Sequence, residues 1–166
     1  MNTLPQINKA QLLERVIAAV QADLDRLQAG LELAKAAKFE SATRMQSRYD
    51  TFGVESSWVA DGLATNLSER LEALRQLRNF KLPDDPRVAG VGSVVGIGPS
   101  GGEVENLYFI LPAGGGLVLP IDGPPGEINV VTPQAPIARK LANRRLGGEP
   151  GGAASAPPET AVLLLA

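Results

Sequence analysis

Apolar side chains recur at steps of three and four residues along the first part of this 166-residue chain, and no proline stands between residues 6 and 82. The stripe consists of Ala10, Leu13, Ile17, Val20, Leu24, Leu27, Leu31 and Ala34. A heptad pattern of this kind lines one side of a helix, as in a coiled coil. We therefore predict a helix from residue 8 to about residue 46, with Asn8 as its N-cap.

A second apolar stripe follows a break at residues 46–53, which ends in Gly53. It consists of Val59, Leu63, Leu67, Leu71, Leu74 and Leu77, and it predicts a helix from about Val54 to Asn79. Two apolar stripes joined by a short turn favour an antiparallel helical hairpin, here over residues 1–80. The first helix is longer than a compact domain of this size needs, so a protruding arm is expected.

The second half of the chain has a different period. Two prolines and two aspartates in the linker, residues 81–87, end the hairpin. Short apolar runs separated by Gly/Pro turns then predict a small antiparallel sheet within residues 88–147. The expected strands are Val91–Ile97, Val104–Leu111, Gly116–Ile121 and Glu127–Val131. Pro136 opens a short helix that runs to about Arg145. The fold class is therefore α+β.

Residues 148–166 are rich in Gly, Pro and Ala, and they predict a disordered tail. The run Val162–Leu165 is too short to cross a membrane, although it could pack on an apolar patch. The start of the chain has neither the basic residues nor the apolar core of a signal peptide. We therefore expect a cytoplasmic protein without membrane contact.

The composition excludes several kinds of chemistry. The chain has no cysteine and no histidine, which excludes disulfides, thiolate nucleophiles, Cys or His zinc sites and a Ser-His-Asp triad. The glycine-rich turns match neither phosphate-binding loop pattern. The net charge of −2 predicts no strong attraction to nucleic acid. Any catalysis would therefore rest on carboxylates, Lys, Tyr, Ser or Thr.

The turn of the hairpin carries two carboxylates, Asp50 and Glu55, with Arg48 and Tyr49 beside them. Two carboxylates across a tight turn could hold Mg²⁺ jointly with a partner, and an arm could deliver them into that partner's active site. The alternative is structural. Asp50 or Thr51 would cap the second helix, and Glu55 would lie in its first turn, where the helix dipole favours an acid.

A basic cluster near the predicted short helix contains Arg139, Lys140, Arg144 and Arg145. Such a cluster could contact phosphate or an acidic partner. The alternative is a solvated helix end, where positive charge is favoured by the dipole. No aromatic residues accompany the cluster, so it offers no surface on which bases could stack.

The string Thr132-Pro133-Gln134-Ala135-Pro136-Ile137-Ala138-Arg139-Lys140-Leu141 resembles the Ser-Pro-Ile-Ala-Arg-x-Leu element of the GreA/GreB family of bacterial transcription elongation factors. The start at Asn8-Lys9-Ala10 and the tip string Tyr49-Asp50-Thr51-x-Gly53-x-Glu55 are similar to a short Gre-like subgroup. The resemblance covers roughly residues 7–147, and the string that includes Pro136, Ile137 and Arg139 is its most specific part.

This resemblance implies a coiled coil that enters the secondary channel of bacterial RNA polymerase and an FKBP-like domain over residues 88–147 that docks on the enzyme. In Gre factors, two tip acids help to hold a Mg²⁺ that drives hydrolysis of backtracked RNA. Asp50 and Glu55 are the matching candidates here, and Arg48, Tyr49, Pro136, Ile137, Arg139, Lys140 and Arg144 are candidates for contact with the polymerase. The chain would hold no cofactor of its own, would share Mg²⁺ only with the polymerase, and would act as a monomer that meets nucleic acid only through the elongation complex.

The sequence also departs from the family. The tip string Asp-Leu-Ser-Glu-Asn is absent, and the Gly/Pro tail replaces the usual terminal strand of the second domain. Polymerase binding is therefore better supported than stimulation of RNA cleavage. Two alternatives stay open: an inhibitor that occupies the same channel without catalytic effect, and a prolyl isomerase of the FKBP type. The few aromatics of the β domain, Tyr108 and Phe109 chief among them, count against the isomerase.

Overall fold

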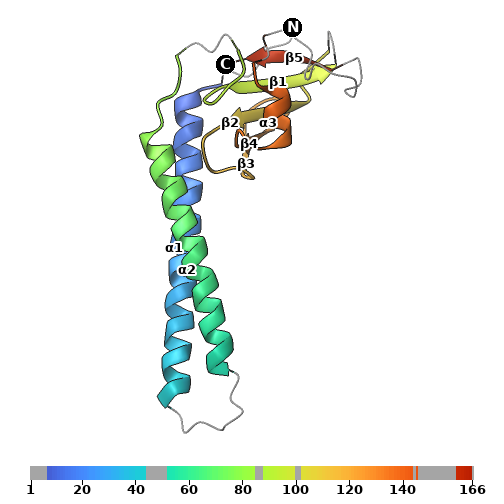
Figure 1. Cartoon of the computed structure of the whole chain (residues 1–166). Coiled ribbons are helices and arrows are strands. Elements are labelled where there is room, and N and C mark those ends of the chain that lie inside the picture. Colours follow the sequence, from blue (N-terminus) through green and yellow to red (C-terminus); the bar gives the residue numbers. More distant parts are fainter. Residues whose placement is uncertain are drawn as a thin grey trace. The chain divides into compact units, whose positions relative to one another are not determined.

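The computed structural model describes residues 7–43, 52–84, 88–99, 102–143, 145 and 160–165 (Figure 1). Two long helices, α1 (Lys9–Thr43) and α2 (Phe52–Asn79), precede a mixed sheet and a short helix, α3 (Pro136–Leu141). This order confirms the predicted α+β class. No helix among these residues has the length and hydropathy of a membrane span.

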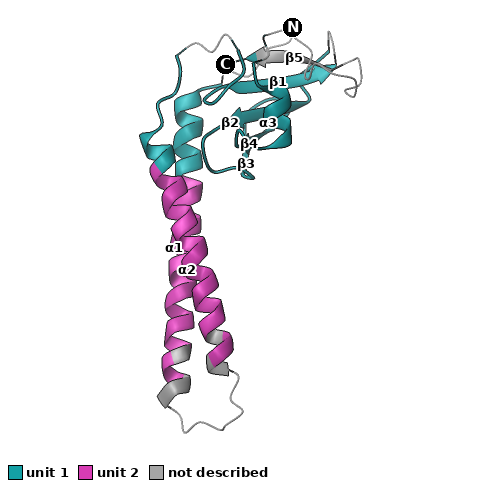
Figure 2. Cartoon of the chain, in the orientation of Figure 1, with its two compact units in different colours: residues 1–17, 76–166 teal, residues 18–75 magenta. Residues whose placement is uncertain are grey.

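The chain divides into two compact units (Figure 2). Unit 2 is the hairpin over Ala18–Arg75, and unit 1 joins Met1–Ile17 to Gln76–Ala166. The first two turns of α1 and the end of α2 therefore group with the sheet. Val16 and Leu77 in these two segments are almost fully buried. The boundaries read from sequence, with a hairpin over 1–80 and a linker over 81–87, stay predictions.

Helix α1 begins as the sequence indicates. The backbone N–H of Gln11 donates to Asn8 Oδ1 at 3.1 Å, which confirms Asn8 as the N-cap. The apolar seam of the hairpin then runs through Val20, Leu24 and Leu31, all nearly buried. A Cβ built on Gly30 would lie 3.6 Å from Leu63 Cδ1, so the two helices approach closely there.

Three residues that were predicted to lie in the apolar seams are exposed instead. Val59 and Leu71 of α2 are about half exposed, and Ala10 of α1 is exposed. The side of α2 that is least exposed passes instead through Ala60, Leu63, Leu67, Arg70, Leu74 and Leu77. In α1 the buried positions begin at Leu12, Leu13 and Val16, because the start of this helix belongs to the unit that contains the sheet.

The sheet has five strands in the order β3-β4-β2-β1-β5. Their bounds are Val94–Pro99 (β1), Asn106–Ile110 (β2), Val118–Pro120 (β3), Glu127–Val131 (β4) and Thr160–Leu165 (β5). The expectation of a wholly antiparallel sheet is wrong for one pair, because β2 and β4 are parallel. The chain leaves β2, adds β3 at the edge beyond the place of β4, and returns between them.

The predicted disorder of residues 148–166 is wrong for their last part. Residues 160–165 form β5, which pairs antiparallel with β1 from Val95↔Leu165 to Pro99↔Thr160 and contains a bulge opposite Gly96 and Ile97. A terminal strand therefore follows the Gly/Pro segment, and it was wrong to expect none. The apolar sequence Ala161–Leu165 suits a strand, and β1 offers its second edge to it.

Helix α3 covers one face of the sheet. Ala138 and Leu141 lie in a buried cluster with Ala89, Val95, Ile97 and Ile110, and Leu165 of β5 packs against that cluster. The opposite face presents a second set of buried side chains: Val94, Leu107, Phe109, Leu119, Ile128 and Val130. Within the same unit, Arg15 Nη2 of α1 donates to the Pro120 carbonyl of β3 at 2.7 Å. The FKBP likeness of this sheet stays a prediction.

Candidate functional site

Most of the predicted tip site lies outside the described residues. Arg48, Tyr49 and Asp50 belong to that undescribed part, as does the predicted cap Thr51. Glu55 is described: it is exposed and lies in the first turn of α2. An acid at this place interacts favourably with the helix dipole, as the structural alternative expects.

The structure does not bring Glu55 together with other metal ligands among the residues that it describes. No group of three Asp or Glu side chains there could hold a metal ion. Glu55 alone could give Mg²⁺ one or two oxygens, whereas the ion needs six ligands. A Mg²⁺ site at the tip would therefore depend on Asp50 and on groups of a partner.

Helix α3 places the other predicted residues. Pro136 stands at the first position of the helix and is exposed, and Ala135 before it has an extended backbone. The side chain of Ile137 is partly buried against the core cluster, and Ala138 is buried. Three residues of the Pro-Ile-Ala-Arg string are thus explained by helix initiation and packing.

The described basic side chains of and after α3 are exposed to solvent. Arg139 and Lys140 are exposed in the last turn of α3, where positive charge is favoured by the helix dipole. The chain then turns at Asn143, whose φ is 63° and whose N–H donates to the Ala89 carbonyl at 2.9 Å. Arg145 is exposed, and Arg144 lies outside the described residues. Arg139 and Lys140 are therefore the two described α3 cations that a partner could reach.

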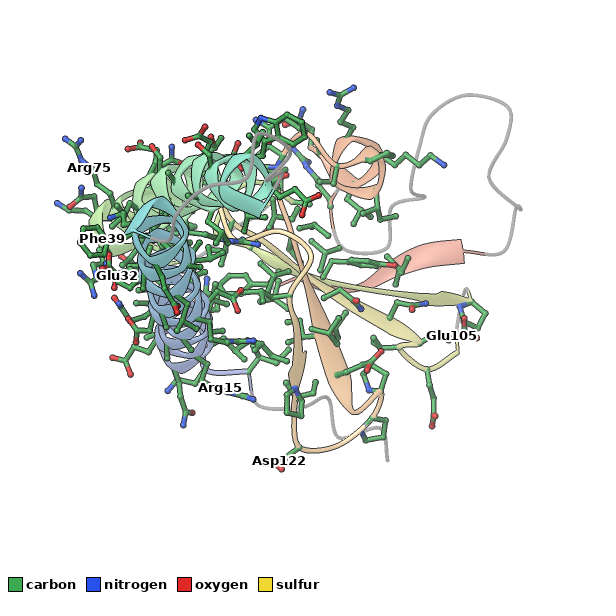
Figure 3. The ribbon with its side chains drawn as sticks, turned by 90° about the horizontal axis from the view of Figure 1, so that it is seen from below. Arg15, Glu32, Phe39, Arg75, Glu105 and Asp122 are labelled. Atoms are coloured by element: carbon green, nitrogen blue, oxygen red, sulfur yellow. The ribbon has the colours of Figure 1, made fainter. Side chains whose placement is uncertain are left out.

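Sequence reasoning missed several exposed apolar side chains on the hairpin. Nine large apolar side chains are exposed among the described residues, and six of them belong to unit 2. These six are Leu33, Phe39, Val54, Trp58, Val59 and Leu71. Figure 3 labels Phe39 on α1, and this side chain is 74% exposed. The signal in the sequence was the single tryptophan, in a stretch, residues 49–69, without lysine or arginine.

The hairpin also carries a shallow polar depression of about 330 Å³, lined by Leu27, Asn66, Glu69 and Arg70. Binding cavities for small molecules are mostly apolar and have a few convergent polar groups. Three of these four side chains are polar and one is apolar. This depression therefore lacks the apolar lining of a typical small-molecule site.

Comparisons with known proteins give no family. No protein-family model matches the chain, and no curated protein matches it significantly. The assignment to a family therefore stays with the resemblance in the sequence.

Solved structures of low identity do match. One is a crystal structure of the GreA factor homolog 1 (Gfh1) protein of Thermus thermophilus, at 15% identity and a TM-score of 0.38, covering 90% of this chain and 94% of that one. Another is Gfh1 of Thermus aquaticus, at 16% identity and a TM-score of 0.35, covering 89% and 92%. A further structure of the transcription factor Gfh1 has 17% identity and a TM-score of 0.32, covering 90% and 92%.

Proposed function

We propose that this chain is a Gre-like regulator that binds bacterial RNA polymerase through its secondary channel. One observation carries the proposal: the string that resembles the Gre element forms helix α3 on a small sheet, in a chain that also contains a long helical hairpin. The hairpin would supply reach into the channel. The unit with the sheet would supply docking area, with Arg139 and Lys140 at its rim and Arg144 beside them.

The chain would act on the polymerase and would not be an enzyme itself. Asp50 and Glu55 would contribute oxygens to a Mg²⁺ that the polymerase holds, and so change elongation or the hydrolysis of backtracked RNA. The tip acids would help to hold the Mg²⁺, which when bound would supply polarisation of the phosphate and activation of water. Contact with nucleic acid would arise only inside the elongation complex, in the cytoplasm.

Binding is tested by co-migration with purified core RNA polymerase on size exclusion, with a known Gre factor as competitor. We expect the chain to co-migrate with the polymerase at micromolar concentrations and the competitor to displace it. A chain that stays in its own fraction at these concentrations would refute the proposal.

The tip mechanism is tested by Asp50→Ala. We expect this variant to bind the polymerase as the original chain does and to lose its effect on RNA cleavage or elongation by about tenfold or more, because one oxygen donor to Mg²⁺ is gone. Cleavage and pausing are read on stalled elongation complexes, and Glu32→Ala, at an exposed acid on the same helical hairpin, serves as a control. Transcription unchanged by Asp50→Ala would remove the tip mechanism.

The absent Asp-Leu-Ser-Glu-Asn string favours a second candidate, a non-catalytic inhibitor of the same channel. Such an inhibitor would increase pausing or reduce initiation without RNA cleavage, in the original chain and in Asp50→Ala alike. The same assays therefore separate the two candidates.

A further inference from the structure

The side of α2 that faces away from α1 has an unusual composition. Val54, Trp58, Asp61 and Thr65 follow one another at steps of four, three and four residues, so they share one face of the helix. All four are exposed, whereas Ala60, Leu63 and Leu67 on the opposite side are partly buried. We call these four residues the outer face of α2.

Trp58 dominates this face. Its side chain is 71% exposed, and Val54, one turn earlier, is 50% exposed. Gly62 lies one turn after Trp58, and a Cβ built there would touch nothing within 4 Å. Gly62 itself therefore brings no side chain over the indole. An exposed indole leaves a large apolar surface in water and adds nothing to the described core. At protein interfaces, by contrast, tryptophan is among the residues that contribute most of the binding energy.

Along the sequence, the charges next to Trp58 have a single sign. Residues 49–69 contain four acidic residues and no lysine or arginine. Two of the acids, Glu55 and Asp61, are exposed on α2, and neither takes part in an ion pair seen among the described residues. Two ion pairs, Arg26–Asp23 and Lys35–Glu32, lie on α1. The outer face is thus an apolar anchor with an acidic rim.

We propose that the outer face of α2 is the docking surface of the hairpin, and that it fits an apolar pocket rimmed by lysine or arginine on the protein that receives the hairpin. The indole of Trp58 fills the pocket, Val54 extends the apolar contact, and Glu55 and Asp61 meet the basic rim. This inference rests on the proposed function, in which the receiving protein is RNA polymerase. A second copy of this chain fits less well. Two outer faces in contact would bring Glu55 and Asp61 of one copy against the same acids of the other, and these like charges would repel.

The test measures the Kd for core RNA polymerase by interferometry, with the full chain held through an N-terminal biotin. We expect Trp58→Ala to weaken binding by about 30-fold or more, as at an interface hot spot. Phe39→Ala is the matched control, because Phe39 is an aromatic residue of similar exposure on the other helix. It should change the Kd by less than about threefold, the range of contacts outside a hot spot.

Charge gives a second, independent variant. Asp61→Lys should weaken binding by about tenfold and reduce its dependence on salt. The substitution replaces a carboxylate that meets the basic rim of the partner with a positive charge that this rim repels. Glu32→Lys on α1 makes the same change at an exposed site off the outer face and should have little effect. Circular dichroism checks that each variant keeps its helix content, which is expected for exposed positions.

The fluorescence of Trp58 gives a direct measure of its burial, because it is the only tryptophan of the chain. Incorporation of 5-hydroxytryptophan allows its fluorescence to be excited selectively beside the ordinary tryptophans of the polymerase. We expect quenching by acrylamide to fall severalfold when the polymerase is added, as the indole becomes buried.

The outcomes separate the two proposals. A chain that binds the polymerase, with Trp58→Ala binding equally well, would overturn the docking surface and leave the proposed function standing. Equal losses in Trp58→Ala and Phe39→Ala would overturn the assignment to the outer face. A chain that does not bind the polymerase would overturn both. Self-association that depends on Trp58, without polymerase binding, would replace the proposed partner with a second copy.

Discussion

Gly92 shows how one backbone position ties the linker to the sheet. Its φ is +91°, and its N–H donates to the Ile110 carbonyl of β2 at 2.7 Å. A Cβ at this position would overlap Pro83 Cδ and come within 3.0 Å of Phe80 Cζ. Only glycine relieves both constraints, because other residues rarely adopt this φ and bring a side chain that has no room.

We therefore expect Gly92→Ala to lower the free energy of unfolding by about 2–4 kcal/mol, since strain at positive φ and overpacking add together. Equilibrium unfolding in urea measures the change. Gly90→Ala is the matched control two residues away, where a Cβ would touch nothing within 4 Å, and it should stay within about 0.5 kcal/mol. Equal losses in the two variants would show that the contact with Pro83 and Phe80 is unimportant.

Strand β5 is the element whose contribution is least expected from composition. It completes one edge of the sheet, and Leu165 packs against the cluster that α3 covers. The opposite edge strand, β3, has its Val118 side chain 52% exposed. Both edge strands are short and apolar, but Leu165 of β5 packs against the core whereas Val118 of β3 is exposed to solvent.

We expect Leu165→Asp to destabilise the protein by about 1–3 kcal/mol, because a charge would replace an apolar contact with the cluster. Val118→Asp places the same charge on the exposed edge and should cost no more than about 1 kcal/mol. Urea midpoints of the two variants give the comparison. If Leu165→Asp were as mild as Val118→Asp, β5 would not contribute to the stability of the sheet.

The elements that sequence could predict are those with a local period. Helices α1 and α2 and the first four strands follow from spacing, and Asn8 follows from capping chemistry. Strand β5 was missed because its partner, β1, lies more than 60 residues earlier, and pairing at that separation leaves no local pattern. The parallel pairing of β2 with β4 was missed because the intervening strand β3 pairs on the far side of β4, and the sequence does not indicate this strand order.

The candidate site was less predictable than the fold. Val59 and Leu71 were assigned to the seam because they fit its spacing, but a stripe that steps by four drifts around a helix of 3.6 residues per turn. Trp58 is exposed because the less exposed side of α2 passes through Ala60, Leu63 and Leu67. Periodicity alone did not decide which side of the helix this would be. Pro136, Ile137 and Arg139 stay candidates for contact with the polymerase. Their sequence pattern did not indicate that Ile137 also packs against the core of unit 1.

At the scale of the whole molecule, the division into units does not follow the linker. Val16 is fully buried and Leu77 is 1% exposed, and both belong to the unit that contains the sheet. Two hydrogen bonds tie the start of α1 to that unit: Lys9 Nζ donates to the Pro83 carbonyl at 2.9 Å, and Arg15 Nη2 to the Pro120 carbonyl. Of these two bonds, that of Arg15 reaches the sheet, at β3. We therefore expect the stability of the sheet to depend on the start of α1.

Two shortened chains test this dependence. Residues 1–17 joined to 76–166 by a short Gly-Asn turn should fold and unfold cooperatively in urea, because unit 1 keeps its own buried side chains. Residues 81–166 alone should lack a cooperative transition, since they lose Val16, Leu77 and both hydrogen bonds from α1, while a domain of this size has little stability to spare. A cooperative transition of 81–166 at the same midpoint as the longer chain would place the boundary at the linker after all, and α1 would then serve the hairpin alone.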